Sequence, residues 1–219
     1  TAGQVLVDGL DTALPENVWE IRRRVGMVFQ NPDNQIVSSL VEEDIAFGVE
    51  NLGVPAEEVR ERVEEALALT ELSEFRQHAP HLLSGGQRQR LAIAGVLAMR
   101  PSCLVLDEPT AMLDPVGRRQ LSDLLQRLNQ SRGVTVVLVT HFMEEAAQAG
   151  RVIVMSAGKI VLDGTPPEVF ANFERLGELG LDLPAAAKIA RGLKRRGIFM
   201  PDDILTAEDL VREVIKAAR

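Results

Sequence analysis

The sequence has 219 residues, a length that suits one sizeable α/β domain with room for a small appended segment. Its content of 46% hydrophobic and 26% charged residues is ordinary for a globular protein. The net charge is −8 and the basic residues are scattered, so the charge pattern counts against nucleic acid as a partner.

The cysteine count and the hydropathy give two further limits. Cys103 is the single cysteine and has no partner for an internal disulfide, which suits a reducing cytosol. No apolar run approaches the roughly 18–20 residues that span a bilayer, so we expect any membrane role to be indirect.

The first predicted elements lie before residue 102. An alternating pattern predicts a strand and turn at 4–9, and a short apolar run predicts a strand at 24–30. The polar loop Asn-Pro-Asp-Asn-Gln follows the second strand. A helix is predicted from Ala56, and a further helix follows Ser84 and ends before Pro101. The helix from Ala56 is expected to bury Val59, Val63, Ala66 and Leu67.

The middle of the chain alternates strands with helices. The runs 103–107 and 134–140 are apolar on both faces, which predicts buried parallel strands. A helix between them begins at Pro115, with Asp114 as its N-cap. Its expected inward side chains are Leu121, Leu124, Leu125 and Leu128. The alternation predicts an α/β fold with a largely parallel sheet whose faces are covered.

The last part of the chain has a different character. After a short helix, a hairpin and a further helix, the segments 184–196 and 206–218 read as two amphipathic helices. We therefore expect a main domain at 1–172 and a helical C-terminal extension at 173–219. This extension could be a dimerisation module, a ligand-sensing appendage or a helical pair that packs on its own domain, and the sequence leaves these alternatives open.

A serine and two glycines precede the helix that begins near residue 85. Ser84 and Gln87 have the spacing of a capping box, so the motif could be only a capped helix. However, a helix N-terminus offers free N–H groups and partial positive charge, and Gly85 and Gly86 let a large anion come close. A phosphate group is the ligand that these features favour.

Two adjacent carboxylates end the strand at 103–107. In phosphoryl-transfer sites the first acid, here Asp107, holds Mg²⁺ and the next, Glu108, orients or deprotonates the attacking water. The alternative is a pair of solvated acids at a strand end. Gln30 and His141 also end predicted strands at this sheet edge, and each is a weak signal alone.

Taken together, these motifs resemble those of the ATP-binding-cassette ATPases from residue 1 to about 172. The sequence LSGGQ resembles the signature motif, LVLDEP the Walker B strand, VFQNP the glutamine loop, AMLD the D-loop and VTH the switch histidine. The resemblance implies a P-loop NTPase-type fold with a helical subdomain at about 31–100. ATP would be the substrate and Mg²⁺ the cofactor.

The resemblance also implies roles for individual residues. Two such subunits would enclose ATP between them, each nucleotide lying under the partner's signature helix. The signature residues Ser84, Gly85, Gly86 and Gln87, together with Asp114, would then contact the nucleotide of a second ATPase subunit. Glu108, Gln30 and His141 would be catalytic, and Asp107 and Gln30 would hold Mg²⁺.

The phosphate-binding loop G-x-x-x-x-G-K-[ST] is absent from these 219 residues, since none of the four lysines precedes serine or threonine. The loop would lie upstream of Thr1 in the family, and the chain lacks both an initial methionine and any tyrosine for adenine stacking. We therefore expect an N-terminal truncation, with natural loss of the loop as the alternative. The chain alone is expected to show no ATP hydrolysis.

The segment 31–55 points to one branch of the family. Its NPDNQ and VEEDIAFG sequences resemble the ATPases of energy-coupling-factor importers, which carry metal ions or B-type vitamins. By that resemblance, residues 31–54 would contact a transmembrane coupling subunit, and the protein would lie at the cytoplasmic face of a prokaryotic membrane. The rival hypothesis is a non-catalytic regulatory protein with the same fold.

Overall fold

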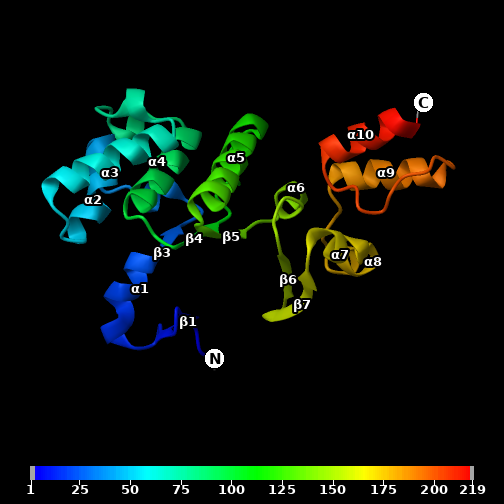
Figure 1. Ribbon diagram of the computed structural model, residues 1–219, viewed down its shortest axis with the longest axis horizontal. Helices are drawn as coiled ribbons and strands as arrows, with labels where there is room; N and C mark the ends of the chain where they lie inside the picture. Colours follow the sequence, from blue (N-terminus) through cyan, green and yellow to red (C-terminus); the bar gives the residue numbers. More distant parts are fainter. Residues whose placement is uncertain (1–2, 218–219) are drawn as a thin grey trace. The chain divides into compact units, whose positions relative to one another are not determined.

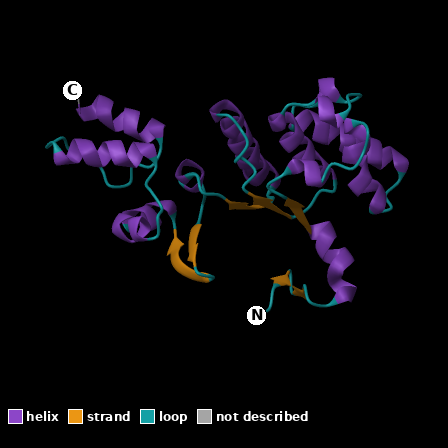
Figure 2. Cartoon of the chain, turned by 180° about the vertical axis from the view of Figure 1, so that it is seen from behind, coloured by secondary structure: helices purple, strands orange, loops and turns teal. Residues whose placement is uncertain are grey.

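The computed structural model describes residues 3–217, and its elements are shown in Figures 1 and 2. The chain forms two compact units, one ending at Val139 and the other starting at Thr140. The predicted boundary at 172/173 falls inside the second unit and stays a prediction. None of the helices in the described residues has the length and hydropathy needed to cross a membrane.

The first unit begins with a two-stranded hairpin and a helix. Strands β1 (Leu6–Val7) and β2 (Leu10–Asp11) pair antiparallel across Asp8 and Gly9, both of which have positive φ. The strand and turn predicted at 4–9 are therefore confirmed. Helix α1 (Val18–Arg24), which the sequence pattern did not predict, follows the 3-10 turn η1 (Pro15–Asn17) and leads into the next strand.

A three-stranded parallel sheet carries the predicted site. Its strands are β3 (Val25–Val28), β4 (Cys103–Asp107) and β5 (Thr135–Val139), in the order β3-β4-β5. Leu106 is paired with Val28 on one side and with Leu138 on the other. Because all three strands run in one direction, their carboxyl ends lie at one edge, as the sequence predicted.

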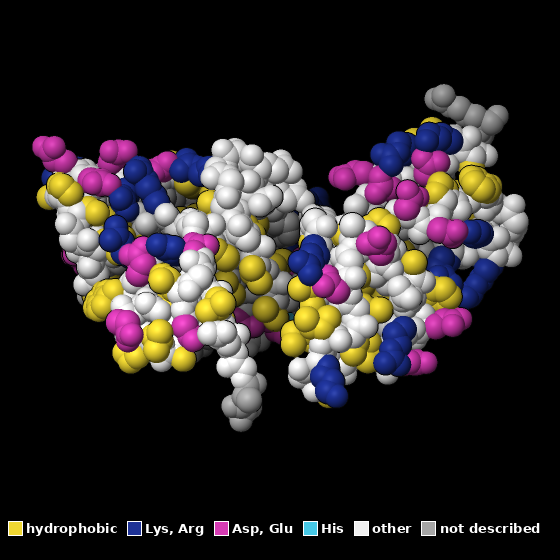
Figure 3. Space-filling model, turned by 60° about the horizontal axis from the view of Figure 1, so that its bottom comes forward, with side chains coloured by type: hydrophobic (Ala, Val, Ile, Leu, Met, Phe, Trp, Pro, Cys, Tyr) yellow, Lys and Arg dark blue, Asp and Glu magenta, His cyan; other side chains and the backbone are white. Residues whose placement is uncertain are grey.

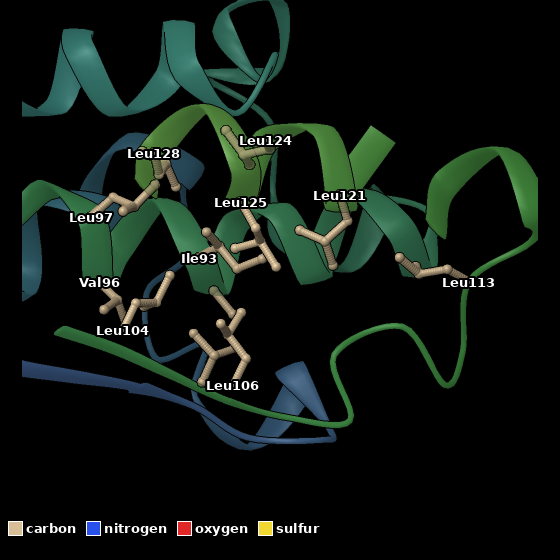
Figure 4. Packing of buried hydrophobic residues seen from close by; sticks show 12 residues of the cluster. Ile93, Val96, Leu97, Leu104, Leu106, Leu113, Leu121, Leu124, Leu125 and Leu128 are labelled. Carbon is tan, nitrogen blue, oxygen red and sulfur yellow. The ribbon is translucent and has the colours of Figure 1, made fainter. Parts of the chain in front are cut away.

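Two helices cover one face of this sheet. They are α4 (Gly85–Ala98) and α5 (Pro115–Arg132). The side chains of Leu104 and Leu106 are fully buried and point toward both helices, as Figure 4 shows. The four predicted leucines of α5, Leu121, Leu124, Leu125 and Leu128, are all buried in this cluster.

The other face of the sheet differs from the prediction of two covered faces. Met27 on β3 and Val137 and Val139 on β5 are 45%, 46% and 50% exposed, and Phe29 just after β3 is 46% exposed. Figure 3, in which the bottom of the view of Figure 1 comes forward, shows hydrophobic side chains at the surface. Since α4 and α5 both pack on the same face, the strands are buried on one side only, and the expectation of fully buried strands was wrong.

A helical region completes the first unit. It contains α2 (Val41–Asn51), α3 (Ala56–Leu69) and the 3-10 turns η2 (Pro32–Asn34), η3 (Ser73–Phe75) and η4 (Pro80–Leu82), packed against α4. Val63, Ala66 and Leu67 are buried and Val59 is partly buried, which confirms the predicted face of α3. The core of this region also contains Val41, Ile45 and Leu91, all fully buried.

The second unit combines a hairpin with short helices. It contains α6 (Met143–Ala146), β6 (Val152–Ser156), β7 (Lys159–Gly164), α7 (Pro166–Ala171), α8 (Phe173–Glu178), α9 (Ala185–Arg195) and α10 (Ala207–Ala217). Its main hydrophobic cluster joins Val154 and Phe170 to Leu176 and Leu205, on both sides of the predicted 172/173 boundary. The last predicted helical residue, 218, lies outside the described residues.

Candidate functional site

The start of α4 is the first part of the site. Ser84 Oγ accepts a hydrogen bond from the backbone N–H of Gln87 at 3.3 Å, and Gln87 Oε1 accepts one from the N–H of Ser84 at 2.7 Å. The predicted capping box is therefore confirmed. The first N–H groups of any helix lack intrahelical acceptors, so this end carries partial positive charge.

The two glycines after Ser84 are not required by the packing of the chain. A Cβ atom added at Gly85 would meet nothing within 4 Å, and one at Gly86 would meet only Leu113 Cδ2 at 3.5 Å, an ordinary contact. Both positions would therefore accept the Cβ atom of an alanine inside this unit. What the glycines provide is an open surface in front of the helix N-terminus, which suits a bulky anion.

The carboxyl end of β4 forms the second part. Asp107 is the last residue of the strand and is half-buried. Glu108 has φ of 45°, a left-handed conformation that is uncommon for a residue other than glycine, and its N–H donates to Val139 O at 2.9 Å. The backbone turns at Glu108. Asp107 and Glu108 therefore both lie at the end of β4, but their backbone conformations differ.

Gln30 joins this corner from the loop that follows the neighbouring strand, β3. Its Nε2 donates to Glu108 Oε2 at 3.0 Å across a separation of 78 residues. The structure therefore brings together two of the four groups that the sequence placed at one sheet edge. An amide beside a carboxylate can hold that carboxylate in a fixed orientation toward a water molecule.

The remaining predicted residues have separate settings. Asp114 is the N-cap of α5, where its Oδ1 accepts from the N–H of Gly117 at 2.7 Å. This bond shows that Asp114 caps the N-terminus of α5, in addition to any role at a nucleotide. His141 lies in the loop between β5 and α6, at the start of the second unit, with its ring 4.2 Å from that of Phe142 between centroids.

The donor set near β4 suits a magnesium ion that completes its shell with phosphate and water. Carboxylate and amide oxygens, as in Asp107 and Gln30, are ligands that Mg²⁺ accepts. The described residues contain no cluster of three or more histidine, cysteine or acidic side chains that could hold a metal by themselves. A site of one or two protein ligands fits a metal that arrives with its nucleotide.

Sequence reasoning missed two polar residues that shape the loop after Gln30. Gln35 Oε1 accepts from the N–H of Phe29 at 2.8 Å, and Gln35 Nε2 donates to Met27 O at 2.9 Å. Asp44 is buried, and its Oδ1 accepts from the N–H groups of Val37 and Ser38 at 2.7 and 3.0 Å. The available signal for Asp44 was an acid beside Ile45 on the apolar face of α2.

Comparison with known proteins shows which family the chain belongs to. Residues 1–111 match the family model described as "ABC transporter". The Energy-coupling factor transporter ATP-binding protein EcfA1 of Caldanaerobacter subterraneus subsp. tengcongensis is 55% identical over 216 residues, covering 99% of this chain and 78% of that protein. EcfA1 of Symbiobacterium thermophilum is 60% identical over 210 residues, covering 96% and 73%.

Solved structures agree with these sequence matches. The structure of cbiO1 from Clostridium perfringens, described as part of the ABC transporter complex cbiONQ, is 38% identical with a TM-score of 0.72 and covers 82% of this chain and 72% of that one. The ATP-binding cassette MJ0796, in a dimeric post-hydrolysis state bound to ADP and Pi, is 34% identical with a TM-score of 0.68 and covers 76% and 74%. The fold class predicted from sequence is confirmed.

Proposed function

Because this chain belongs to the ATP-binding-cassette transporter family, we propose that it is the ATP-binding subunit of an energy-coupling-factor importer for a metal ion or a vitamin. Its signature helix would supply Ser84, Gly85, Gly86 and Gln87 to ATP held by a second cassette. The observation that supports this most directly is the open, capped start of α4, where the chain itself does not need the two glycines.

The second cassette would hold the nucleotide that the signature helix completes. The 219 residues contain no G-x-x-x-x-G-K-[ST] motif, so the charge of β- and γ-phosphates lacks its usual cradle within this sequence. Asp114 would act across the same interface. We expect the chain alone to show no magnesium-dependent ATP hydrolysis.

Glu108, Asp107, Gln30 and His141 would serve a nucleotide on the chain's own side only together with a phosphate loop, which these 219 residues do not contain. Glu108 would orient or deprotonate the attacking water, and the bond from Gln30 would fix the carboxylate that does so. Asp107 and Gln30 would contribute oxygen ligands to Mg²⁺, which neutralises the phosphate charge when bound. His141 would contact the terminal phosphate.

The segment 31–54 would contact a transmembrane subunit at the cytoplasmic face of the membrane. Within it, Val37 and Phe47 are 62% and 50% exposed, although their neighbours Val41 and Ile45 are fully buried. Exposed apolar side chains beside a closed core suit a protein partner. Residues 173–219 would form a C-terminal extension to the main domain at 1–172.

The test is ATP hydrolysis by a composite site. A partner cassette of this family that has its own phosphate loop is prepared with its signature serine replaced by arginine, so that its own dimers are inactive. Addition of this chain should restore magnesium-dependent hydrolysis. Failure to restore it, with both proteins folded, would contradict the proposal and favour a non-catalytic regulatory protein.

Gly86→Ala separates the proposed role from folding. A Cβ fits here at 3.5 Å from Leu113, and alanine favours a helix over glycine by up to about 1 kcal/mol, so the variant should be at least as stable as the wild type. It should nevertheless reduce the restored hydrolysis, because the methyl group adds bulk at a position proposed to contact the nucleotide of the second cassette. Gly53→Ala is not a suitable control since Gly53 has positive φ; Gly192→Ala, in open space on α9, is.

A further inference from the structure

Arg88 connects the start of the signature helix to the segment that follows Gln30. Its Nη1 donates to Leu83 O at 2.6 Å, and Leu83 directly precedes the Ser84 cap. Its Nε lies 2.8 Å from Asp33 Oδ1. The N–H direction is not aligned with that oxygen, so the contact is an ion pair rather than a hydrogen bond.

Asp33 is itself held in place by a compact turn. It lies in η2, where its N–H donates to Asn31 Oδ1 at 3.0 Å, and Pro32 beside it is buried. The next residue but one, Gln35, is fixed to the end of β3 through Phe29 and Met27. The carboxylate of Asp33 therefore stands on a turn that is anchored to the sheet.

A second connection joins the same two segments farther along. The backbone N–H of Val41 donates to His78 O, and that of Glu42 donates to Arg76 O, both at 3.1 Å. These bonds fix the start of α2 to the chain that leads into the signature helix. The backbone after Gln30 and the backbone before Ser84 are thus linked at two places within one unit.

We propose that the Asp33–Arg88 ion pair positions the Ser84 cap relative to the Gln30 loop. The inference rests on the function proposed above and names two positioning residues for it. Arg88 acts through the carbonyl of Leu83, and neither side chain needs to touch the nucleotide.

The charges explain why Asp33 matters more than an ordinary surface acid. The Arg88 side chain is 28% exposed, and its Nε is buried with Asp33 as the anion beside it. Removal of the negative charge leaves a buried part of a cation without its counter-charge. Since the Asp33 side chain is 58% exposed, the effect on overall stability should be small, and the effect on the geometry of the cap should be the larger one.

The first test measures restored hydrolysis in the composite-site assay as a function of ATP concentration. Asp33→Asn and Arg88→Lys should raise the ATP concentration for half-maximal rate, by up to about fivefold for an ion pair of this exposure, with little change in the maximal rate. Asp33→Glu keeps the charge and should behave like the wild type. Arg90→Ala is the matched control, because Arg90 lies on the same helix with a similar side-chain exposure of 22% and pairs with Glu71 instead.

A purely structural role would give a different pattern. Partial unfolding would lower the maximal rate in proportion to the folded fraction and leave the half-saturating ATP concentration unchanged. That pattern, or variants indistinguishable from the wild type while the wild type restores hydrolysis, would overturn the inference. If the wild-type chain restores no hydrolysis at all, the proposed function fails instead.

A second test needs no partner. Amide hydrogen exchange in the chain alone reports how firmly the start of α4 is held. Asp33→Asn should accelerate exchange of the Gln87 and Arg88 amides, which both bond to Ser84, and Arg90→Ala should leave it unchanged. Equal exchange of these two amides in Asp33→Asn and the wild type would contradict the positioning role, whatever the hydrolysis assay gives.

Discussion

The helical region and the parallel sheet of the first unit bury their apolar side chains to different degrees. In the helical region, the apolar stripe of α2 is completely buried, with Val41, Ile45 and Val49 at 0% exposure. In the sheet, Val28 is equally buried, but Val139 on the opposite face is 50% exposed. The single apolar face of the helix α2 is buried within this unit. The strands have apolar side chains on both faces of the sheet, and only one of these faces is buried.

The largest expected effect on stability tests this difference with the same substitution, valine to alanine, on each face of the sheet. Val28→Ala removes two methyl groups from a fully buried site and should lower the free energy of unfolding by about 2–3 kcal/mol. Val139→Ala should cost less than about 1 kcal/mol, because half of its surface is already exposed. Urea unfolding of both variants measures this, and equal losses would mean that the second face is covered in solution.

The next effect concerns the hydrogen bonds between Asp44 on α2 and the loop after Gln30. Asp44→Ala leaves the N–H groups of Val37 and Ser38 without their acceptor and should cost about 1–3 kcal/mol. Glu43→Ala, at the exposed neighbouring position on α2, is the matched control and should change stability by less than about 0.5 kcal/mol. Similar values for the two variants would show that the loop after Gln30 is held by other contacts.

A smaller effect is expected at the helix that covers the sheet. Asp114→Ala removes the N-cap of α5 and should cost about 1 kcal/mol. Asp123→Ala, at an exposed position inside the same helix, should be close to neutral. Thermal unfolding of the two variants compares them directly. A loss of hydrolysis in the composite-site assay beyond the loss of folded protein would indicate a role for Asp114 at the nucleotide.

The smallest effect depends on pH and concerns the connection between α3 and α5. Arg132 and Arg100 pair with Glu65 and hold the pKa of its carboxyl below its ordinary value. Because the folded pKa is lower than the unfolded one, the stabilisation is fully present above the unfolded pKa, and it is lost as pH falls through the folded pKa.

Comparison of unfolding free energies tests that pH dependence. The difference between the wild type and Glu65→Gln should be at most about 1 kcal/mol near pH 7 and should shrink progressively below about pH 4.5. Glu57→Gln, at an exposed position earlier in α3, is the control. A difference that stays constant from pH 7 to pH 3 would contradict the assigned ion pairs.

Local sequence signals predicted much of the fold and part of the site. The Ser84–Gln87 capping box and the leucine face of α5 depend on spacings within one helix, and both are confirmed. The meeting of Gln30 with Glu108 was predictable because parallel strands bring their carboxyl ends to one edge.

The missed features depend on contacts between distant segments. Gln35, Asp44 and Arg88 are ordinary polar residues in the sequence, and their importance comes from backbone groups that the fold brings to them. The open face of the sheet was also missed, since an apolar strand pattern does not state which elements cover it. The roles of all the candidate site residues remain predictions; these are Gln30, Ser84, Gly85, Gly86, Gln87, Asp107, Glu108, Asp114 and His141.

The central claim is that this chain completes a nucleotide site on another cassette. The most direct measurement is the association of the chain with a partner cassette that binds ATP without hydrolysing it. Sedimentation with and without ATP measures this association. The wild type and Glu108→Gln should associate only when ATP is present, and Gly86→Asp should not associate, because its carboxylate meets the phosphates. Association that is independent of ATP, or is unchanged in Gly86→Asp, would contradict the account.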